Sequence, residues 1–514
     1  MNKSYKERLT PIMGWASWNN YHVNISEDIL KKQVDALIST GLADVGYTYF
    51  NIDDGFFGGR DEKGFVKPHP KRFPSGMKAM ADYIHSKGLK AGIYSDAGSN
   101  TCAHYYDNPD GNTDGVGVGL YGYDEQDLRM YLIDWGYDFI KVDWCGGLRL
   151  GLDEQTRYTE IGNIIEKIRE EKKSDIIYNV CRWQFPGEWV VEVADSWRVS
   201  TDIHRDFKSI LRQIDAVKEL EKYHGPGHVN DLDMLQVDRG LSYEEDKTHF
   251  AMWCMMSTPL MLGNDLTTIS DETLSIIKNT ELIEINQDVA CLQATLANSQ
   301  GDIEIWVKDL GGKNSNQKAI ALLNRGDLPA EITVKWSDYG FERVTNVRDV
   351  WEHKNLEVGG TYTVKVPAHG TQVYKITGEI TEKLPEHLAK KGKSVVDLPK
   401  AGGNAADSSK KDNNTVDLTK TESNTVSSTK RAEYISSEMA QEKVKKGSVL
   451  IDVRTPEEYE ENHIDGAINI PHTNILISIQ EVVPDKNTEV IVYCSARKRS
   501  EQARDSLNYL GYHN

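Results

Sequence analysis

Short apolar segments recur through the first ~270 residues, about one every 40 residues, and nearly all end in an acid, an amide or a tryptophan. A strand that is buried on both faces reads as a continuous apolar run. A polar side chain at its carboxyl end lies where a (β/α)8 barrel builds its active site. The pattern predicts parallel strands and a pocket rich in carboxylates. The segments cover residues 11–15, 49–54, 91–96, 139–143, 176–181, 196–202, 228–233 and 259–265.

Helical patterns separate these segments. Residues 27–40 carry apolar side chains at helical spacing after Ser26, a suitable N-cap. The ranges 77–87 and 125–135 each end before a glycine, Gly88 and Gly136, and 157–172 follows the fourth strand. Such alternation favours parallel pairing through right-handed crossovers. An open doubly wound sheet is the alternative, but the first strand lacks a glycine-rich phosphate turn, which favours a closed barrel.

The pattern changes near residue 290. Short segments at 302–308, 318–324, 330–336, 361–366 and 371–376 follow, several of them alternating between apolar and polar residues, with Gly, Asn and Asp between them. This is typical of antiparallel strands and predicts a β-sandwich. We therefore expect a (β/α)8 TIM barrel over 1–285 and an antiparallel β-sandwich over 286–380.

The last part of the chain has two different compositions. Residues 381–430 are rich in Lys, Ser, Asn, Thr and Asp and have little to bury, so we expect a flexible low-complexity linker. From 431 to 514 an α/β pattern resumes, with strands expected at 449–454 and 489–494, a helical turn at 456–461 and a helix at about 500–510. We expect a small separate α/β domain there.

Composition limits the classes of function. A net charge of −19 disfavours a nucleic-acid partner, because nucleic-acid-binding domains usually carry a basic patch. No stretch of about 18 apolar residues is present, so no transmembrane segment is expected. The six cysteines are too few for a disulfide scaffold and lack the spacing of zinc fingers. The first ten residues do not form a signal peptide, and we expect that a leader has been removed.

Acids and tryptophans at the strand ends suggest carbohydrate chemistry. Two carboxylates about 5 to 5.5 Å apart can cleave a glycoside with retention of configuration. Tryptophan faces can stack on a sugar ring. A single aspartate in this position can instead cap a helix, and some of the tryptophans can belong to the core. The residues concerned are Asp53, Asp54, Asp96, Asp143, Asp202, Asp231 and Asp233, with Trp15, Trp18, Trp144, Trp183 and Trp197.

Six ordered motifs over about residues 9–375 resemble the α-galactosidases (melibiases) of glycoside hydrolase family 27. The resemblance covers both the expected barrel and the expected sandwich. The motifs are Met13-Gly-Trp-Ala-Ser-Trp-Asn, Ile52-Asp-Asp-Gly, Lys141-Val-Asp-Trp-Cys, Arg198-Val-Ser-Thr-Asp, Asn230-Asp-Leu-Asp-Met-Leu and Thr258-Pro-Leu-Met-Leu-Gly-Asn-Asp-Leu.

The resemblance implies a role for each matching residue. Asp143 matches the nucleophile and Asp202 the acid/base. Asp53 and Asp54 match a pair that binds the galactose 4- and 6-hydroxyls, and Lys141 and Arg198 match residues that bind the sugar. Further matches are Trp18, Tyr94, Asp233 and Met234, together with a disulfide between Cys102 and Cys145 at the rim.

Electrostatics gives these roles a physical meaning. Lys141 is expected to lower the pKa of Asp143, which must attack while ionised. The pKa of Asp202 is expected to be raised toward neutrality, as a general acid requires.

The chain departs from the family where the sugar 2-position is read. The loop that starts at Cys181 carries Arg182, Trp183 and Gln184, and these bulky residues argue against a pocket for an N-acetyl group. The exact sugar therefore stays open between α-galactose, α-N-acetylgalactosamine and β-L-arabinopyranose. Asp54 is the acid typical of galactose recognition. Residues 105–119 look like an insertion that shapes the binding of the aglycone.

The C-terminal domain has its own reactive candidate. Cys494 ends a strand in a basic loop with Arg497, Lys498 and Arg499, and a helix follows; cations and a helix N-terminus favour a thiolate. A buried, inert cysteine is the alternative. Residues 433–514 resemble single-domain rhodaneses, with Cys494 matching the persulfide carrier and Asp452, Arg454 and Arg499 matching supporting residues. The family loop more often carries a glycine in its middle, and the chain ends early enough to suggest a missing final strand.

We predict a retaining exo-glycosidase that removes terminal α-D-galactose from oligosaccharides or glycoconjugates without a cofactor or metal. The rival hypotheses are a carbohydrate-binding protein with an inactive barrel and a protein whose main activity is sulfur transfer. The sequence leaves the oligomeric state open. A rim disulfide favours a periplasmic or secreted location, whereas a reactive thiolate leaves the cytoplasm open.

Overall fold

The computed structural model describes residues 9–105, 115–312, 315–380, 437–472, 475, 479, 482–494, 498–510 and 512. The chain divides into two compact units, Met1–Leu398 and Pro399–Asn514. The expected linker at 381–430 lies outside the described residues, as do 106–114 of the expected insertion and most of the chain end after Leu510.

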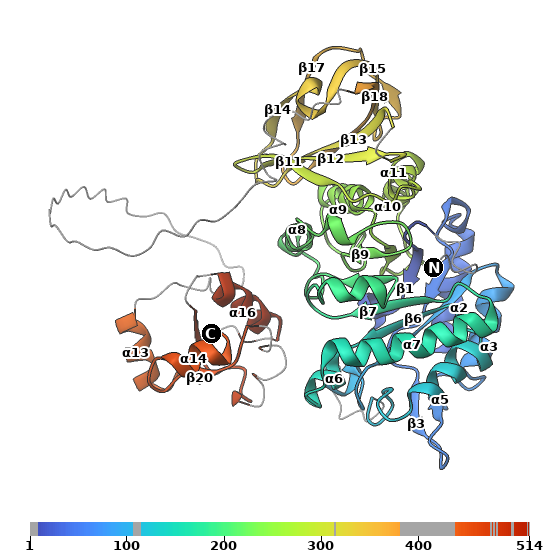
Figure 1. The fold of residues 1–514 in the computed structure, drawn as a ribbon, viewed down its shortest axis with the longest axis vertical. Helices are drawn as coiled ribbons and strands as arrows, with labels where there is room; N and C mark the ends of the chain where they lie inside the picture. Colours follow the sequence, from blue (N-terminus) through green and yellow to red (C-terminus); the bar gives the residue numbers. More distant parts are fainter. Residues whose placement is uncertain are drawn as a thin grey trace. The chain divides into compact units, whose positions relative to one another are not determined.

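Parallel strands form the barrel of the first unit, in the order β10-β1-β2-β5-β6-β7-β8-β9 (Figure 1). Leu235, which follows β9, pairs in parallel with Leu262 of β10. Its N–H donates to the carbonyl oxygen of Met261 at 2.7 Å, so the two edges of the sheet meet. The strands are β1 (Met13–Ala16), β2 (Tyr49–Asn51), β5 (Lys90–Asp96), β6 (Phe139–Asp143), β7 (Ile177–Cys181), β8 (Ser196–Arg198), β9 (Val229–Asp231) and β10 (Leu260–Leu262).

Helices cover the outside of the barrel and largely follow the sequence pattern. The first major helix, α2, begins after Ser26, whose hydroxyl accepts from the N–H of Ile29, so the predicted cap is confirmed. Gly88 and Gly136 have positive φ angles at the ends of their helices, as expected for C-caps. The helices are α2 (Glu27–Ser39), α3 (Met77–Ser86), α5 (Asp124–Arg129), α7 (Glu154–Lys172), α8 (Phe207–Ala216), α9 (Tyr243–Met256), α10 (Asp271–Ile277) and α11 (Thr280–Asn286).

Two helices differ from their predicted form. The segment predicted as 125–135 is split into α5 and a π-helical turn, η2 (Met130–Asp134). Helix α7 begins three residues before the predicted start, because the carboxylate of Asp153 accepts from the N–H of Thr156 and caps it. Shorter elements follow the carboxyl ends of several barrel strands. They are α1 (Trp18–Tyr21), α4 (Cys102–Tyr105), α6 (Cys145–Arg149) and a hairpin of β3 (Phe57–Arg60) and β4 (Val66–Pro68).

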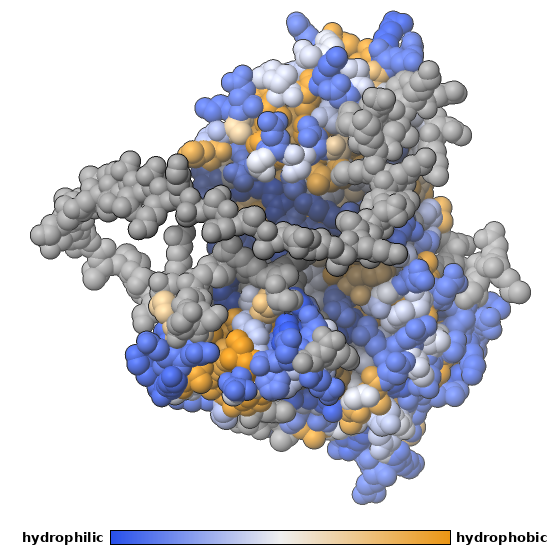
Figure 2. Space-filling view, turned by 60° about the vertical axis from the view of Figure 1, so that its left-hand side comes forward, coloured by the Kyte–Doolittle hydropathy of each residue, from blue (hydrophilic) through white to orange (hydrophobic). Residues whose placement is uncertain are grey.

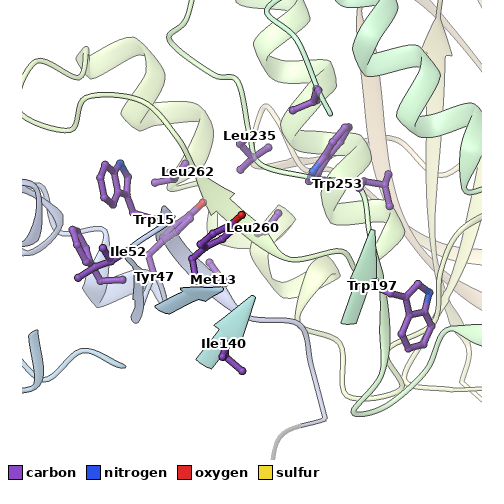
Figure 3. Close-up of a cluster of buried hydrophobic side chains, with 14 of the residues drawn as sticks. Met13, Trp15, Tyr47, Ile52, Ile140, Trp197, Leu235, Trp253, Leu260 and Leu262 are labelled. Atoms are coloured by element: carbon purple, nitrogen blue, oxygen red, sulfur yellow. The ribbon is translucent and has the colours of Figure 1, made fainter. Parts of the chain in front are cut away.

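Large apolar side chains fill the space between strands and helices. Figure 3 shows part of this core, where Trp15, Tyr47 and Ile52 lie on one side and Trp197 and Trp253 on the other. All five are inaccessible to solvent. Burying a large side chain of this kind stabilises the folded state by roughly 1.5 to 3 kcal/mol, so the barrel holds the strand ends in fixed positions.

An antiparallel sandwich follows the barrel and contacts α9, as Figure 1 shows. Its six-stranded sheet has the order β11-β12-β13-β18-β15-β16, and a two-stranded sheet pairs β14 with β17. One face of the larger sheet joins the barrel core, for example through Trp306, and the other joins a separate core around Ile320 and Trp336. The strands are β11 (Thr295–Gln300), β12 (Ile303–Leu310), β13 (Gln317–Asn324), β14 (Ala330–Lys335), β15 (Phe341–Asp349), β16 (Lys354–Asn355), β17 (Thr361–Val366) and β18 (Thr371–Ile380).

The second unit contains a parallel sheet in the order β20-β19-β21. The predicted strands and helices are present, although the last helix begins at Lys498, two residues before its predicted start. The elements are α13 (Ser437–Lys445), β19 (Val449–Asp452), α14 (Pro456–Glu461), β20 (Ile468–Asn469), β21 (Val490–Tyr493) and α16 (Lys498–Tyr509).

On the face that Figure 2 shows, hydrophilic residues predominate and groups of apolar residues lie among them. Within the described part of the chain, no helix has both the length and the apolar character needed to cross a membrane. This agrees with the absence of a long apolar segment from the sequence.

Candidate active site

The predicted sugar-binding residues meet inside the barrel at the carboxyl ends of its strands. A cavity lies there. Its polar lining comes from six strands or the residues that follow them. These residues are Asn51, Asp53, Tyr94, Lys141, Asn179, Ser196, Arg198, Asp231 and Asp233, with Met234 among the apolar lining residues.

Lys141 connects two of the predicted acids. Its Nζ lies 3.0 Å from Oδ2 of Asp53 and 3.9 Å from Oδ2 of Asp143. Alternate residues of a strand share a face, so Lys141 and Asp143 of β6 point to the same side. Burial lowers the pKa of Lys141, but the charge of Asp53 and of its other neighbours outweighs burial and holds that pKa well above its ordinary value. The ammonium group therefore stays charged.

Asp143 is a buried carboxyl group with a neighbouring cation. Burial raises its pKa to about 6, while the charge of Lys141 opposes this shift and the charge of Asp202 adds to it. Its Oδ1 also accepts from the N–H of Trp144 at 2.9 Å. Asp143 and Asp202 thus lie close enough for one charge to affect the pKa of the other.

Arg198 forms the second cationic centre. Its Nη2 lies 2.6 Å from Oδ2 of Asp233 and 3.1 Å from Oδ1 of Asp202. Burial raises the pKa of Asp202, but Arg198 and Lys141 outweigh it, and the pKa of Asp202 lies below its usual value. Burial also raises the pKa of Asp233 to about 6. The side chain of Asp202 remains 43% exposed, whereas that of Asp143 is 7% exposed.

The two carboxyl pKa values therefore differ from the sequence-based expectation. We expected a lowered pKa for Asp143 and a raised one for Asp202, and the protein without bound sugar has the reverse order. The physical reason is that burial dominates at Asp143, while a close guanidinium dominates at Asp202. A sugar that covers Asp202 would remove water from it and raise its pKa.

Asp54 lies deeper than the sequence suggests. It is fully buried, and its two oxygens accept from the backbone N–H groups of Gly55 and Ala103, each at 2.8 Å. Burial raises its pKa to about 7. Asp53 lies beside it and uses Oδ1 to accept from the N–H of Asp54 at 2.8 Å. To bind a sugar hydroxyl, Asp54 must therefore use the oxygen lone pairs that these two backbone N–H groups leave available.

The expected disulfide between Cys102 and Cys145 is present and joins α4 to α6. The α4 segment carries Ala103, the partner of Asp54. Gly98 and Gly146 pack together behind this link, and a side-chain carbon on Gly98 would lie 2.0 Å from the carbonyl carbon of Gly146. The disulfide thus connects the proposed nucleophile strand to the group that holds Asp54.

One group of side chains in the described ranges has potential metal ligands close together, namely Asp96, Cys102 and Cys145. Both sulfurs belong to the disulfide. One oxygen of Asp96 accepts from the N–H groups of Gly98 and Gly146, at 2.6 and 3.0 Å. In this state Asp96 is a loop anchor, as the alternative interpretation of a single strand-end aspartate allows.

The five tryptophans divide between core and site. Trp15, Trp144 and Trp197 are at most 2% exposed, so they belong to the core and cannot stack on a sugar. Trp18 and Trp183 are partly exposed and remain candidates. The neighbouring Arg182 is buried and donates from Nε to Oε2 of Glu154 at 2.8 Å, which ties this loop to α7.

Sequence reasoning missed an amide at the centre of the site. Nδ2 of Asn179 donates to Oγ of Ser196 at 2.8 Å and to Oδ2 of Asp231 at 2.9 Å. Oδ1 of Asp231 in turn accepts from the N–H of Asp233 at 2.9 Å. The available signal was a polar residue in the middle of the apolar strand segment 176–181.

The second unit places Cys494 after β21, beside the start of α16. Its sulfur accepts from the N–H of Ser500 at 3.3 Å. Arg499 pairs with Glu458 at 2.5 Å, and Arg454 pairs with Asp452 at 2.7 Å, so a carboxylate compensates each charge. Arg497 and the side chain of Lys498 lie outside the described residues.

Comparison with known proteins identifies all three folded parts. The family model described as alpha galactosidase A matches residues 10–288, that of the alpha galactosidase C-terminal beta sandwich domain matches 300–376, and that of the rhodanese-like domain matches 432–514. Alpha-galactosidase A of Cellvibrio japonicus is 36% identical over 393 residues, covering 72% of this chain and 92% of the relative. Alpha-galactosidase 3 of Arabidopsis thaliana is 38% identical over 379 residues, covering 72% and 82%. The crystal structure of alpha-galactosidase I from Mortierella vinacea has a TM-score of 0.66 at 31% identity, covering 74% of this chain and all of that one.

The protein is a glycoside hydrolase, because it combines a (β/α)8 barrel that carries carboxylates at its strand ends with a β-sandwich that follows it. Within that class, the chain belongs to the alpha galactosidase A family, the melibiases of glycoside hydrolase family 27, and carries a rhodanese-like domain at its C-terminal end.

Proposed function

We propose that the protein hydrolyses terminal α-D-galactosyl residues of oligosaccharides or glycoconjugates with retention of configuration. The observation that carries this proposal is the pairing of each predicted catalytic acid with its own cation, Asp143 with Lys141 and Asp202 with Arg198. The names of the relatives, several of them alpha-galactosidases at 36–38% identity, support the galactosyl specificity.

In the first step, a carboxylate oxygen of Asp143 attacks the anomeric carbon of the sugar. The glycosidic bond breaks, and the leaving oxygen takes a proton from Asp202. In the second step, water attacks the same carbon, gives its proton to Asp202 and releases Asp143. Once Asp143 is an ester it carries no charge, which lowers the pKa of Asp202 and suits its role as the base.

Sugar binding is proposed for the groups that line the cavity. Among them, Asp53, Lys141 and Arg198 offer charged hydrogen-bonding groups, and Met234 offers apolar contact. Trp18, which packs against the apolar cluster that contains Met234, is proposed as a further apolar contact. The disulfide supports action in an oxidising space, and we propose a periplasmic or extracellular location on that ground. We further propose domain boundaries near residue 285, at the end of α11, near residue 380, at the end of β18, and near residue 430.

Hydrolysis of p-nitrophenyl α-D-galactoside tests the proposal. The same assay with p-nitrophenyl α-N-acetylgalactosaminide and β-L-arabinopyranoside separates the three candidate sugars. We expect the α-galactoside to have the highest kcat/KM. A protein that binds galactose but leaves all three substrates intact would be a binding protein with an inactive barrel.

A second candidate activity, sulfur transfer, rests on Cys494. The thiol is partly exposed at a strand end and lies beside Arg499, an arrangement that suits a reactive sulfur. Transfer of sulfur from thiosulfate to cyanide tests it, with Cys494→Ala as the inactive variant and the buried Cys254→Ala as the matched control. Equal turnover by wild type and Cys494→Ala would exclude Cys494 as the carrier.

A further inference from the structure

The end of β5 carries a buried carboxylate that is only half compensated. Asp96 is inaccessible to solvent, and its Oδ1 accepts from the N–H groups of Gly98 and Gly146. Its Oδ2 is also buried and has no hydrogen-bond partner in the described part of the chain. A buried carboxylate oxygen without a partner is costly, and a bound ion is one of the partners that can compensate it. This oxygen therefore points to a ligand.

Two sulfur atoms lie beside this carboxylate. Cys102 begins α4 and Cys145 begins α6, and both are buried. One oxygen of Asp96 and the two Sγ atoms all lie within 4.8 Å of one another. In a tetrahedral zinc site the Zn–S and Zn–O bonds are about 2.3 and 2.0 Å long, which places neighbouring ligand atoms roughly 3.5 to 3.8 Å apart. One ion therefore fits between the three atoms once the two sulfurs are no longer bonded to each other.

Contacts other than the S–S bond also position these groups. The N–H of Cys102 donates to the phenol oxygen of Tyr94 at 3.3 Å. A side-chain carbon on Gly146 would lie 2.8 Å from Oδ1 of Asp96, so the segment that follows Cys145 packs directly against the carboxylate. Strands β5 and β6, which precede the two segments, pair in parallel. The three donors therefore stay near one another when the S–S bond is broken.

The donor set selects the kind of ion. Two thiolates and one carboxylate are ligands for Zn²⁺, whereas Mg²⁺ and Ca²⁺ prefer oxygen ligands alone. Three protein ligands leave the fourth tetrahedral position to a water molecule. The donors come from three separate segments of the chain, so this site does not require the cysteine spacing of zinc fingers, which the sequence lacks.

We propose that Asp96, Cys102 and Cys145 bind one Zn²⁺ ion when the disulfide is reduced. Two electrons and two protons from the reductant break the S–S bond and give two thiols. Zn²⁺ then displaces both thiol protons and binds the two thiolates and the available oxygen of Asp96. The net charge of the buried site stays the same, because two protons leave as one divalent cation enters.

The ion takes over the link that the disulfide makes between α4 and α6. In a reducing environment it would thus keep Ala103 in place, whose N–H donates to Asp54 at 2.8 Å. The inference does not depend on the proposed sugar chemistry, since it concerns the binding of a metal to three side chains of the rim.

Metal titration of the full chain tests the site. The parent protein for this test carries Cys494→Ala, because Cys494 is a partly exposed thiol that can bind metals on its own. It is reduced with tris(2-carboxyethyl)phosphine, which is oxidised to the phosphine oxide, and is then desalted without oxygen. We expect one Co²⁺ per chain, with the charge-transfer absorption of thiolate-bound cobalt and the visible bands of a tetrahedral ion. Zn²⁺ should displace this cobalt, because N/O/S sites generally bind zinc more tightly.

Variants identify the ligands. Asp96→Asn keeps the shape of the side chain, and its amide oxygen can still accept from Gly98 and Gly146. Loss of an outer-shell partner alone costs about 10- to 100-fold in metal affinity, so we expect this loss of a direct ligand to weaken Zn²⁺ binding by about 100-fold. Cys254→Ala, at a buried cysteine outside the site, is the matched control and should bind as the parent does. Equal Zn²⁺ binding by Asp96→Asn and the parent, or by the oxidised and reduced proteins, would overturn the site.

Chemical denaturation gives a second readout. A ligand that binds only the folded state stabilises it, so Zn²⁺ should raise the urea midpoint of the reduced parent, and a chelator should reverse this rise. The oxidised parent should not respond, and Asp96→Asn should respond much less. A reduced parent that stays unfolded in the presence of Zn²⁺, or a midpoint that Zn²⁺ raises equally in Asp96→Asn, would also contradict the proposal.

Discussion

The ammonium group of Lys141 lies 3.9 Å from the carboxylate of Asp143, two residues further along the same strand. This spacing places a permanent cation on the face of β6 that carries the proposed nucleophile. The cation opposes the effect of burial on Asp143, whose pKa is nevertheless raised to about 6. The balance between burial and charge at this carboxyl group sets the pH range in which it can attack.

The pH dependence of kcat/KM should report this pKa. Asp143 must be ionised to attack, so we expect activity to fall as the pH drops below about 6. Replacing Lys141 with Met removes the cation that favours the ionised form. The pKa of Asp143 should then rise, and the acid limb should move to higher pH. A pH–rate profile of both proteins checks this, and an acid limb that stays in place would show that another group controls it.

Azide rescue distinguishes the roles of Asp143 and Asp202. We expect Asp143→Gly and Asp202→Gly each to lose roughly 10³- to 10⁴-fold in kcat with p-nitrophenyl α-galactoside. Azide should restore turnover in both variants. It takes the place of the removed carboxylate and attacks the anomeric carbon from that side of the sugar ring. Asp143→Gly should therefore give β-galactosyl azide, and Asp202→Gly should give α-galactosyl azide. NMR of the products gives the configuration. The opposite assignment of the two azides would exchange the roles.

The disulfide between Cys102 and Cys145 should affect both stability and binding. It closes a loop with a sequence separation of 43 residues. The loop-entropy model gives about 4 kcal/mol for a loop of that size. We therefore expect the double variant Cys102→Ser, Cys145→Ser to unfold at lower denaturant concentration. Its KM should rise more than its kcat falls, because α4 holds Asp54 through Ala103. The matched control is Cys291→Ser, at a buried cysteine that belongs to no disulfide and lies outside the site.

Arg60 is expected to be critical for folding of the catalytic loops. Its side chain donates to the carbonyl oxygens of Gly64, Gly117 and Gly119 and forms two hydrogen bonds to the fully buried Asp127. Arg60→Met would leave a buried carboxylate without its partner, which costs about 3 to 5 kcal/mol of stability. Chemical denaturation measures this loss. The double variant Arg60→Met, Asp127→Leu should recover part of the lost free energy of unfolding, because it removes the unpaired carboxylate. If the double variant loses as much stability as Arg60→Met, the hydrogen bonds of Arg60 to the glycine carbonyl oxygens dominate.

Local patterns in the sequence were sufficient for most of the barrel. Ser26 marks the start of α2 and Gly88 marks the end of α3. The sequence predicts both ends because N-cap and C-cap conformations depend on only a few neighbouring residues. Strand β15 was not predicted. Its sequence, Phe341-Glu-Arg-Val-Thr-Asn-Val-Arg-Asp, is mostly polar, and pairing with the neighbouring strands β18 and β16 makes it a strand.

The sequence by itself determined which residue types stand at the strand ends, and thereby the family and the set of candidate acids. The two-residue spacing of Lys141 and Asp143 also suffices to place both side chains on one face of strand β6. Only the tertiary structure decided that Trp15, Trp144 and Trp197 are core residues, that Asp54 is buried, and that burial makes Asp143 less acidic than Asp202. Burial and the distance between charges are sums over residues far apart in the chain, and no local pattern contains them.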